Sequence, residues 1–221
     1  MSVVGVIPAR AGSKRLPGKN LVALAGRPLL AYTCAAAVES RALTAIYVNT
    51  DSAEIAAVAE QNGVACPALR PKHLAADDTP TRDSNLFILD LLHRRGERYD
   101  AVMVLQPTSP LRTAEDIRGA WGLFEEHAPC AVVSVTALVP ESWTGRIGRD
   151  GQFERAVGDE TLYRLNGAIY IHCWDDYVDD RPPRKTVAYL MPAARSIDID
   201  TPIDLEYARF MLQQSRQAVG L

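Results

Sequence analysis

VVGVIPARAGSKRLPGKN, residues 3–20, decides the fold class of this 221-residue chain. Its first six residues form a continuous apolar run that is too short for a helix and ends at Pro8, which is typical of a strand buried on both faces. The loop that follows carries four cations and two glycines, Gly12 and Gly18, which permit a close approach of the backbone to a ligand. Open α/β sheets bind ligands just beyond the carboxyl ends of their strands, so this loop is a candidate binding site.

The rest of the chain alternates short apolar runs with longer helical patterns. Further strands are expected at 45–50, 101–106, 130–137, 167–172 and 186–191, and helices at 28–40, 52–63, 81–95, 113–127 and 202–217. This rhythm predicts a single α/β domain over 1–221, with three layers (α/β/α) and a mainly parallel sheet. The stretch from about 138 to 165 interrupts the rhythm. It contains the hairpin signal Asp150-Gly151, so we expect an arm there.

Charge is distributed unevenly along the chain. The 24 basic and 27 acidic residues give a net charge of −3 and a pI near 5.8, which disfavours a bulk nucleic-acid binder. Residues 1–38 hold five cations and no acid, which leaves 19 cations and 27 acids, or −8, in the remainder. Lys14 and Lys19 are two of only four lysines beside 20 arginines. A local positive field on an acidic protein predicts a small anionic ligand.

The cysteines and the hydropathy pattern indicate the compartment. The four cysteines lie far apart with no CxxC pair, and no apolar window approaches ~18 uninterrupted residues. The four histidines show no metal or triad spacing. We therefore expect a cytoplasmic protein without a disulfide framework, a zinc site or membrane contact.

The basic loop departs from the known phosphate-binding templates. The P-loop pattern GxxxxGK[ST] requires glycine where Ser13 stands and Ser or Thr where Asn20 stands, and the dinucleotide-binding GxGxxG is absent. One interpretation is a solvated basic loop. The position after the first strand and the clustered lysines favour another, a loop that wraps a triphosphate with cationic side chains and backbone N–H groups.

IDID, residues 197–200, is the second stretch with chemical meaning. In an extended segment Asp198 and Asp200 project from the same face, where two like charges repel unless a cation lies between them. Mg²⁺, a hard cation with oxygen ligands, is the natural occupant beside a triphosphate. The alternatives are the polar face of an edge strand, or Asp200 acting only as the N-cap of the next helix.

Four stretches occur in the order typical of one family. IPARAGSKRLPGKN (7–20), LQPTSPLR (105–112), YRLNGAIYI (163–171) and SIDIDTPIDL (196–205) resemble the signature runs of the CMP-sialic-acid synthetases, the cytidylyltransferases that activate acidic sugars. The resemblance spans nearly the whole chain. It implies a Rossmann-like nucleotidyltransferase fold with a small β-hairpin arm that makes a homodimer. It also implies transfer of CMP from CTP to an acidic sugar of the nonulosonic type, with Mg²⁺ as cofactor and pyrophosphate released.

The resemblance further implies roles for individual residues. It assigns catalysis to Arg10, Lys19 and Asp200, and metal binding to Asp198 and Asp200. The implied nucleotide-binding residues are Ala9, Arg10, Ser13, Lys14, Lys19, Asn20, Arg70 and Thr81. The implied acceptor-binding residues are Gln106, Arg112 and Asn166.

Four of these assignments have alternatives. LAADDTPT (74–81) matches the family loosely, so Thr79 is an alternative to Thr81. Arg70 is equally a plain surface residue, since arginine is mostly exposed. Arg112 is also a candidate for local structure, and Asn166-Gly167 is also an ordinary turn signal.

The stretch between Val135 and Leu165 departs from the family pattern. Sialate-activating members carry a basic H-P-x-K-type element where Glu141-Ser142-Trp143 stands, and an arginine-bearing Q-x-L-P segment that is missing here. The acceptor is therefore open between a nonulosonic acid, Kdo and a phosphonate such as phosphonoformate. A nucleotide-binding module without turnover is a further interpretation, which Lys19 and the two aspartates disfavour.

Overall fold

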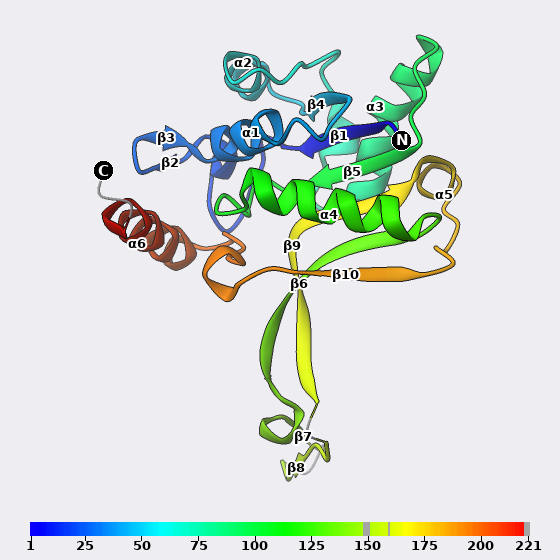
Figure 1. Cartoon of the computed structure of the whole chain (residues 1–221). Helices are drawn as coiled ribbons and strands as arrows, with labels where there is room; N and C mark the ends of the chain where they lie inside the picture. The colour runs from blue at the N-terminus through cyan, green and yellow to red at the C-terminus, as the bar shows by residue number, and fades with distance from the viewer. Residues whose placement is uncertain (148–150, 159, 219–221) are drawn as a thin grey trace.

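A six-stranded sheet forms the centre of the molecule, in the strand order β10-β6-β9-β5-β1-β4 (Figure 1). The computed structural model describes residues 1–147, 151–158 and 160–218, with side chains to residue 214. The strands are β1 (Val3–Pro8), β4 (Ala45–Asn49), β5 (Ala101–Leu105), β6 (Ala131–Pro140), β9 (Thr161–Cys173) and β10 (Thr186–Leu190). Only β9 runs antiparallel to its neighbours among these described strands, so the predicted mainly parallel sheet is confirmed.

Helices cover both faces of the sheet and complete the predicted three layers. They are α1 (Leu29–Ser40), α2 (Ala53–Gln61), α3 (Thr81–Arg94), α4 (Ala114–His127), α5 (Trp174–Val178) and α6 (Pro202–Ala218). Short 3-10 turns lie at η1 (Lys19–Leu21), η2 (Lys72–Ala75), η3 (Glu141–Trp143) and η4 (Ala193–Arg195). Short paired strands form two further hairpins, β2 (Ala23–Leu24) with β3 (Arg27–Pro28) and β7 (Gly145–Ile147) with β8 (Phe153–Arg155).

Strand β1 is buried on both faces, as its continuous apolar run predicts. Val3 and Ile7 belong to the core cluster beneath α1, α2 and α4, whereas Val4 and Val6 belong to the cluster beneath α3 and α5. The alternation follows from the two-residue period of a strand, which sends successive side chains to opposite faces. Both layers of the core therefore meet at β1, directly before the basic loop.

Helix α4 begins as its sequence predicts. The Thr113 hydroxyl accepts a hydrogen bond from the Asp116 N–H (3.2 Å), and the Asp116 carboxylate accepts one from the Thr113 N–H (2.9 Å). This reciprocal capping box satisfies two of the backbone donors that a helix start leaves without partners. It also places a fully buried carboxylate at the first turn of α4.

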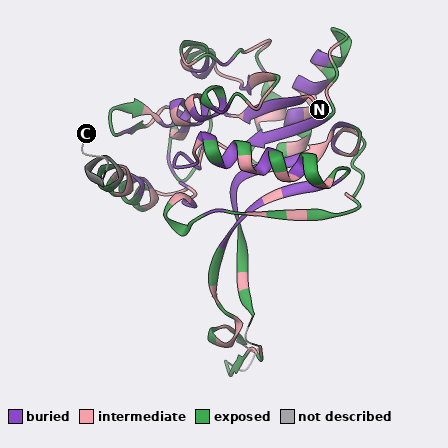
Figure 2. Ribbon diagram, viewed as in Figure 1, coloured by how far each residue is buried: buried purple, intermediate pink, exposed green. Residues whose placement is uncertain are grey.

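Strands β6 and β9 continue beyond the sheet as a two-stranded arm that projects from the body of the molecule (Figure 1). The arm is largely exposed, in contrast to the buried central strands (Figure 2). The pairing register shifts between Val133 and Val135, where β9 holds extra residues and Gly167 adopts φ +77°. This bulge lies where the strand leaves the core. Asp150 of the predicted turn lies outside the described residues, and Gly151 beside it has φ +82°.

Two further expectations concern the cysteines and the membrane. All four cysteines are free thiols. Across the described part of the chain, no helix combines the length and the apolar character needed to cross a bilayer.

Candidate active site

A cavity of about 290 Å³ opens at the carboxyl ends of β1 and β5. Four stretches distant in sequence form its walls: the basic loop, the segment 70–84, the turn after β5, and the IDID segment. The lining residues are Pro8, Arg10, Gly12, Ser13, Lys19, Asn20, Arg70, Leu74, Ala76, Asp77, Thr79, Thr81, Ser84, Gln106, Pro107, Thr108, Asp198 and Asp200. The cavity lies where an open α/β sheet is expected to bind its ligand.

Hydrogen bonds hold the basic loop against the end of β4. The Ala9 N–H donates to the Asn49 carbonyl (3.0 Å), and the Ala11 N–H donates to Asp51 Oδ1 (2.9 Å). The buried Asn20 side chain donates to the Arg10 carbonyl (2.8 Å) and closes the loop on itself. The loop is therefore a built wall of the cavity rather than a merely solvated basic segment.

Two cations of the loop contact Asp200. Lys19 Nζ lies 2.9 Å from Asp200 Oδ1, and an Arg15 nitrogen lies 2.8 Å from Asp200 Oδ2. The Lys19 side chain is only 15% exposed. Lys19 therefore acts at low local dielectric, where its charge counts for more toward an anion in the cavity than that of an exposed lysine.

The other two cations of the loop pair with Asp77. Arg10 and Lys14 contact its carboxylate at 2.6 and 2.7 Å. Hydrogen bonds from Lys14 and Arg10 hold the pKa of Asp77 below its usual range. Lys14 is 81% exposed and stands beside the cavity without lining it, and Ala9 is buried behind the wall. Of this pair, Arg10 is thus the cation that faces the cavity.

The IDID segment presents both aspartates to the cavity because its isoleucines are buried. Ile197 and Ile199 pack in an apolar cluster, and the two-residue period turns the carboxylates the other way. The Ile199 N–H donates to the Thr108 carbonyl (2.8 Å), which ties the segment to the turn after β5. Burial raises the pKa of Asp198 above its usual value, and the neighbouring Asp200 adds to the effect.

Asp200 does not serve as the N-cap of α6. The Thr201 hydroxyl accepts from the Asp204 N–H (3.4 Å), and the Asp204 carboxylate accepts from the N–H groups of Thr201 (2.7 Å) and Asp200 (3.0 Å). The capping box thus belongs to Thr201 and Asp204. The interpretation of Asp200 as a cap only is wrong, and its carboxylate remains available to cations.

The donor set fits a Mg²⁺ ion that is shared with a polyphosphate. Within residues 1–147, 151–158 and 160–218 no group of three or more His, Cys, Asp or Glu side chains is arranged to hold a metal. Mg²⁺ is commonly bound by only one or two carboxylates together with substrate phosphates and water. Asp198 and Asp200 supply that number, beside a loop suited to phosphates.

Arg70 lines the cavity as a buried side chain, so its interpretation as a plain surface residue is wrong. Its backbone N–H donates to the Thr50 carbonyl (2.7 Å), and its guanidinium lies 3.8 Å from Asp51 Oδ1. Burial lowers the pKa of Arg70, and its Nε has no hydrogen-bond partner in the structure. Thr79 and Thr81 both line the cavity, so both alternatives for the threonine position stand.

Of the three acceptor-side residues, only Gln106 lines the cavity. The buried Arg112 donates to the carbonyls of Gln106 (3.2 Å) and Ala168 (2.9 Å), which gives it the structural role, and burial lowers its pKa to about 10. The buried Asn166 amide donates to Ser196 Oγ (2.9 Å). The expected direct contact of Arg112 and Asn166 with the acceptor is therefore wrong, because both side chains lie behind the cavity wall and support it.

Sequence reasoning misses three polar residues that line the cavity, namely Asp77, Ser84 and Thr108. It also misses the role of Gly167, which lies close to two of the lining side chains. A Cβ atom on Gly167 would lie 3.0 Å from Gln106 Oε1 and 3.8 Å from Asp198 Oδ2, so this glycine lets β9 pass close to both side chains. The available signal is the Asn166-Gly167 pair, which in the sequence alone is equally a turn. Asp77 lies within the loosely matched LAADDTPT, where the resemblance points only to the threonines.

Comparison with known proteins places these features in a family. The profile of the cytidylyltransferase family matches residues 4–139. The CMP-N,N'-diacetyllegionaminic acid synthase of Legionella pneumophila is 39% identical over 236 residues, which cover 99% of this chain and 100% of that protein. The N-acylneuraminate cytidylyltransferase of Escherichia coli is 35% identical over 99% of this chain, which spans 54% of the E. coli protein.

Solved structures share the fold at low sequence identity. CMP:2-keto-3-deoxy-manno-octonic acid synthetase, solved as a complex with CTP, matches with a TM-score of 0.74 and 19% identity over 97% of this chain and 100% of that one. A 4-diphosphocytidyl-2C-methyl-D-erythritol synthase from Anaerococcus prevotii matches with a TM-score of 0.73 and 15% identity over 96% of this chain and 98% of that one. The predicted Rossmann-like nucleotidyltransferase fold is thus confirmed. With the family profile and relatives of 35% and 39% identity, the chain belongs to the cytidylyltransferases and, among them, to the CMP-sialic-acid synthetase family.

Proposed function

We propose that this chain transfers CMP from CTP to an acidic sugar of the nonulosonic type and releases pyrophosphate, with Mg²⁺ as cofactor. The observation that carries the proposal is the contact of Lys19 with Asp200, because it joins the phosphate-binding loop to the carboxylate pair inside one cavity. Relatives named for diacetyllegionaminic acid and N-acylneuraminate, 39% and 35% identical over 99% of this chain, support the class of acceptor.

The basic loop binds the triphosphate of CTP. Arg10 and Lys19 line the cavity and exchange their carboxylate partners for phosphate oxygens, while Gly12 and Ser13 admit the phosphates close to the backbone. Phosphoryl transfer needs little covalent help from the protein and depends on positioning and on stabilisation of developing charge. Lys19, as the less exposed of the two lysines in the loop, contributes most to that stabilisation.

Arg70 and Asn20 bind the cytosine. The base presents a ring carbonyl and an exocyclic amine, so it needs both donors and acceptors. The Arg70 guanidinium lines the cavity and offers only donors, which suits it to a carbonyl oxygen. Hydroxyls of Thr79, Thr81 and Ser84 line the same cavity and can accept from an amine.

Asp198 and Asp200 hold the metal ion. When bound, Mg²⁺ supplies charge neutralisation at the α-phosphate and lowers the pKa of the acceptor hydroxyl. Arg15 contacts Asp200 Oδ2 at 2.8 Å and keeps that carboxylate in place when Lys19 turns to the phosphates.

Gln106 orients the acceptor. The acceptor hydroxyl oxygen forms a bond to the α-phosphorus, the bond between that phosphorus and the bridging oxygen breaks, and pyrophosphate leaves with the electron pair. The hydroxyl proton passes to water. Gln106 lines the cavity at the carboxyl end of β5, and its amide both donates and accepts hydrogen bonds, so it aligns the hydroxyl without taking its proton.

A second copy of the chain packs against the arm to make a homodimer. Large apolar side chains on the arm are exposed, Trp143 by 76% and Val157 by 97%. Ile147, Phe153 and Leu165 are exposed beside them. An apolar surface of this kind marks an interaction site. A monomeric mass by light scattering at micromolar concentration would contradict the homodimer.

Pyrophosphate release tests the activity. The protein is incubated with CTP and Mg²⁺ and, in turn, N-acetylneuraminate, N,N'-diacetyllegionaminate, pseudaminate, Kdo and phosphonoformate. We expect release with a nonulosonic acid, none without an acceptor, and loss of release when EDTA removes the metal. Release with only Kdo or only the phosphonate would reassign the acceptor. Tight CTP binding with no release for any acceptor would identify a nucleotide-binding module instead.

A further inference from the structure

The segment that carries Asp198 and Asp200 needs an external support. It runs from the end of β10 to the start of α6 and contains only the single turn η4. Site residues must be held within about 0.5 Å of a productive geometry, and loops achieve this only when neighbouring side chains lock them. The contacts that fix this segment therefore bear on the position of the carboxylates.

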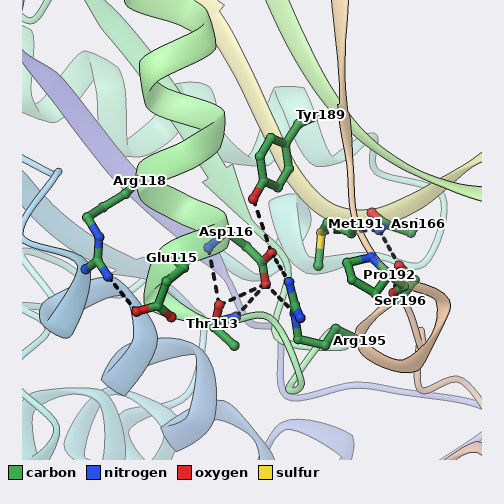
Figure 3. Close-up of polar contacts among 10 residues, drawn as sticks. All are labelled: Thr113, Glu115, Asp116, Arg118, Asn166, Tyr189, Met191, Pro192, Arg195 and Ser196. Atoms are coloured by element: carbon green, nitrogen blue, oxygen red, sulfur yellow. Dashed lines mark hydrogen bonds and ion pairs between the residues drawn. The ribbon is translucent and has the colours of Figure 1, made fainter.

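The first support is the ion pair of Arg195 with Asp116. Arg195, in η4, donates from Nη2 to Asp116 Oδ1 (2.8 Å) and from Nε to Asp116 Oδ2 (3.0 Å), a two-pronged contact (Figure 3). The Tyr189 hydroxyl lies 3.3 Å from the same carboxylate. Asp116 is fully buried in the first turn of α4, so the anchor point itself is rigid.

The second support acts on the next residue, Ser196. Its hydroxyl accepts from the Asn166 amide (2.9 Å) and donates to the Pro192 carbonyl (2.9 Å), as Figure 3 shows. Its carbonyl accepts from Arg164 (3.2 Å). Two residues further along lies Asp198, and the Ile199 N–H after it is bonded to the turn that follows β5. Hydrogen bonds thus hold the segment at Ser196, before its two aspartates, and at Ile199, between them.

Capping of α4 alone does not account for Arg195. Thr113 and Asp116 already complete the capping box without it. Only Asp116 is buried in this pair, because the Arg195 side chain is 37% exposed, and ion pairs that reach solvent contribute little to stability. The geometry instead links a fixed carboxylate on α4 to the residue three positions before Asp198.

We infer that Arg195 and Asp116 are positioning residues that hold Asp198 and Asp200 in place for the metal ion, with Ser196 as the link between them. The inference rests on the proposed function, since it concerns the same metal-binding carboxylates. Loss of a supporting contact of this kind typically weakens metal binding or activity about 10–100-fold.

Arg195→Met is the principal test, and Arg118→Met is its matched control. Arg118 lies on α4 and pairs at 2.6 Å with Glu115, three residues earlier on the same helix (Figure 3). Its side chain is 46% exposed, close to the 37% of Arg195. It contacts Glu115 on α4 and the Ser40 carbonyl on α1, away from the carboxylate segment. Both substitutions replace an ion-paired arginine with methionine, so they differ in whether the lost pair supports the aspartates.

Direct cation binding provides a readout besides activity. Mn²⁺, which can be followed by electron paramagnetic resonance, is titrated into each protein with saturating CTP, and the Mg²⁺ concentration for half-maximal pyrophosphate release is measured in parallel. We expect both constants to rise about 10–100-fold in Arg195→Met and to stay unchanged in Arg118→Met. Arg195→Lys keeps the charge without the two-pronged contact, so intermediate constants are expected. CTP binding without metal should be the same in all of these proteins.

The outcomes separate the inference from the proposed function. A wild-type protein that binds no Mn²⁺ with CTP and releases no pyrophosphate would overturn the proposed function. A wild type that does both, with Arg195→Met showing a lower melting temperature but unchanged cation constants, would overturn the inference alone. If Arg195→Met does not fold, Ser196→Ala takes its place, with the same rise expected and an unchanged constant again decisive against the inference.

Discussion

Replacing Gly167 with alanine should damage the acceptor side of the cavity more than it damages the fold. Gly167 has φ +77°, and a left-handed backbone costs a residue with a Cβ about 1–2 kcal/mol. The new Cβ would lie 3.0 Å from Gln106 Oε1 and 3.8 Å from Asp198 Oδ2, so the Gln106 amide has to shift. A misplacement of about 1 Å can cost 10²-fold in rate, and for this smaller shift we expect kcat/KM for the acceptor to fall on the order of tenfold.

Gly96→Ala is the matched control for this substitution. Gly96 follows α3 with φ +79°, and a Cβ there would meet no atom within 4 Å. Both variants should lose about 1–2 kcal/mol of unfolding free energy in urea, because the backbone strain is the same. Only Gly167→Ala should lose activity in steady-state pyrophosphate release with the acceptor varied. Equal kinetics in the two variants would refute the close approach of β9 to Gln106.

Three further predictions concern charged residues. Lys19→Ala removes the loop cation that contacts Asp200, so kcat should fall about 10²–10³-fold. The control Lys185→Ala should leave kcat unchanged. Near-normal turnover in Lys19→Ala would exclude the role of Lys19 in phosphate binding. Asp77→Asn frees two loop cations from their carboxylate, so calorimetry should find tighter CTP binding; weaker binding would mean that Asp77 positions the loop instead. Burial alone would raise the pKa of Asp116, but hydrogen bonds from Arg195 and Thr113 hold that pKa below its usual value. The ionised carboxylate therefore stabilises the folded state at neutral pH. This stability is lost as the pH falls from about 3.9, the pKa of an unperturbed Asp, through the lower pKa of the folded state. Asp116→Asn should therefore flatten the acid limb of the unfolding free energy, and an unaltered slope would contradict this.

The fold can be predicted largely from local patterns. The apolar run before Pro8 specifies a strand buried on both faces, and the structure divides its side chains between two core clusters. Thr113 and Asp116, three residues apart, specify the start of α4. Such features depend on neighbours in sequence, which is why they are visible without a structure.

The wall of the cavity depends on contacts between distant residues, and sequence patterns miss part of it for that reason. Lys19 and Asp200 are 181 positions apart, and no local pattern brings them together: only their complementary charge and the family resemblance suggest that they meet. Arg112 belongs to the same motif as Gln106, and Asn166 to another motif of the family, yet both lie behind the wall that Gln106 lines. A motif identifies which residues gather around a site, but tertiary packing decides which of them face the cavity.

Strand β9 belongs to two parts of the molecule at once. On the core side of its bulge it pairs through Ile171 and Tyr170 with Val132 and Val133, and on the other side it forms one edge of the arm. The stretch 138–165 can therefore be grafted from one relative to another while these core pairs and the loop after β1 keep their sequence. Chimeras of this kind would exchange the stretch that departs from the family pattern at two strand positions, without a new connection to the cavity that the loop after β1 lines.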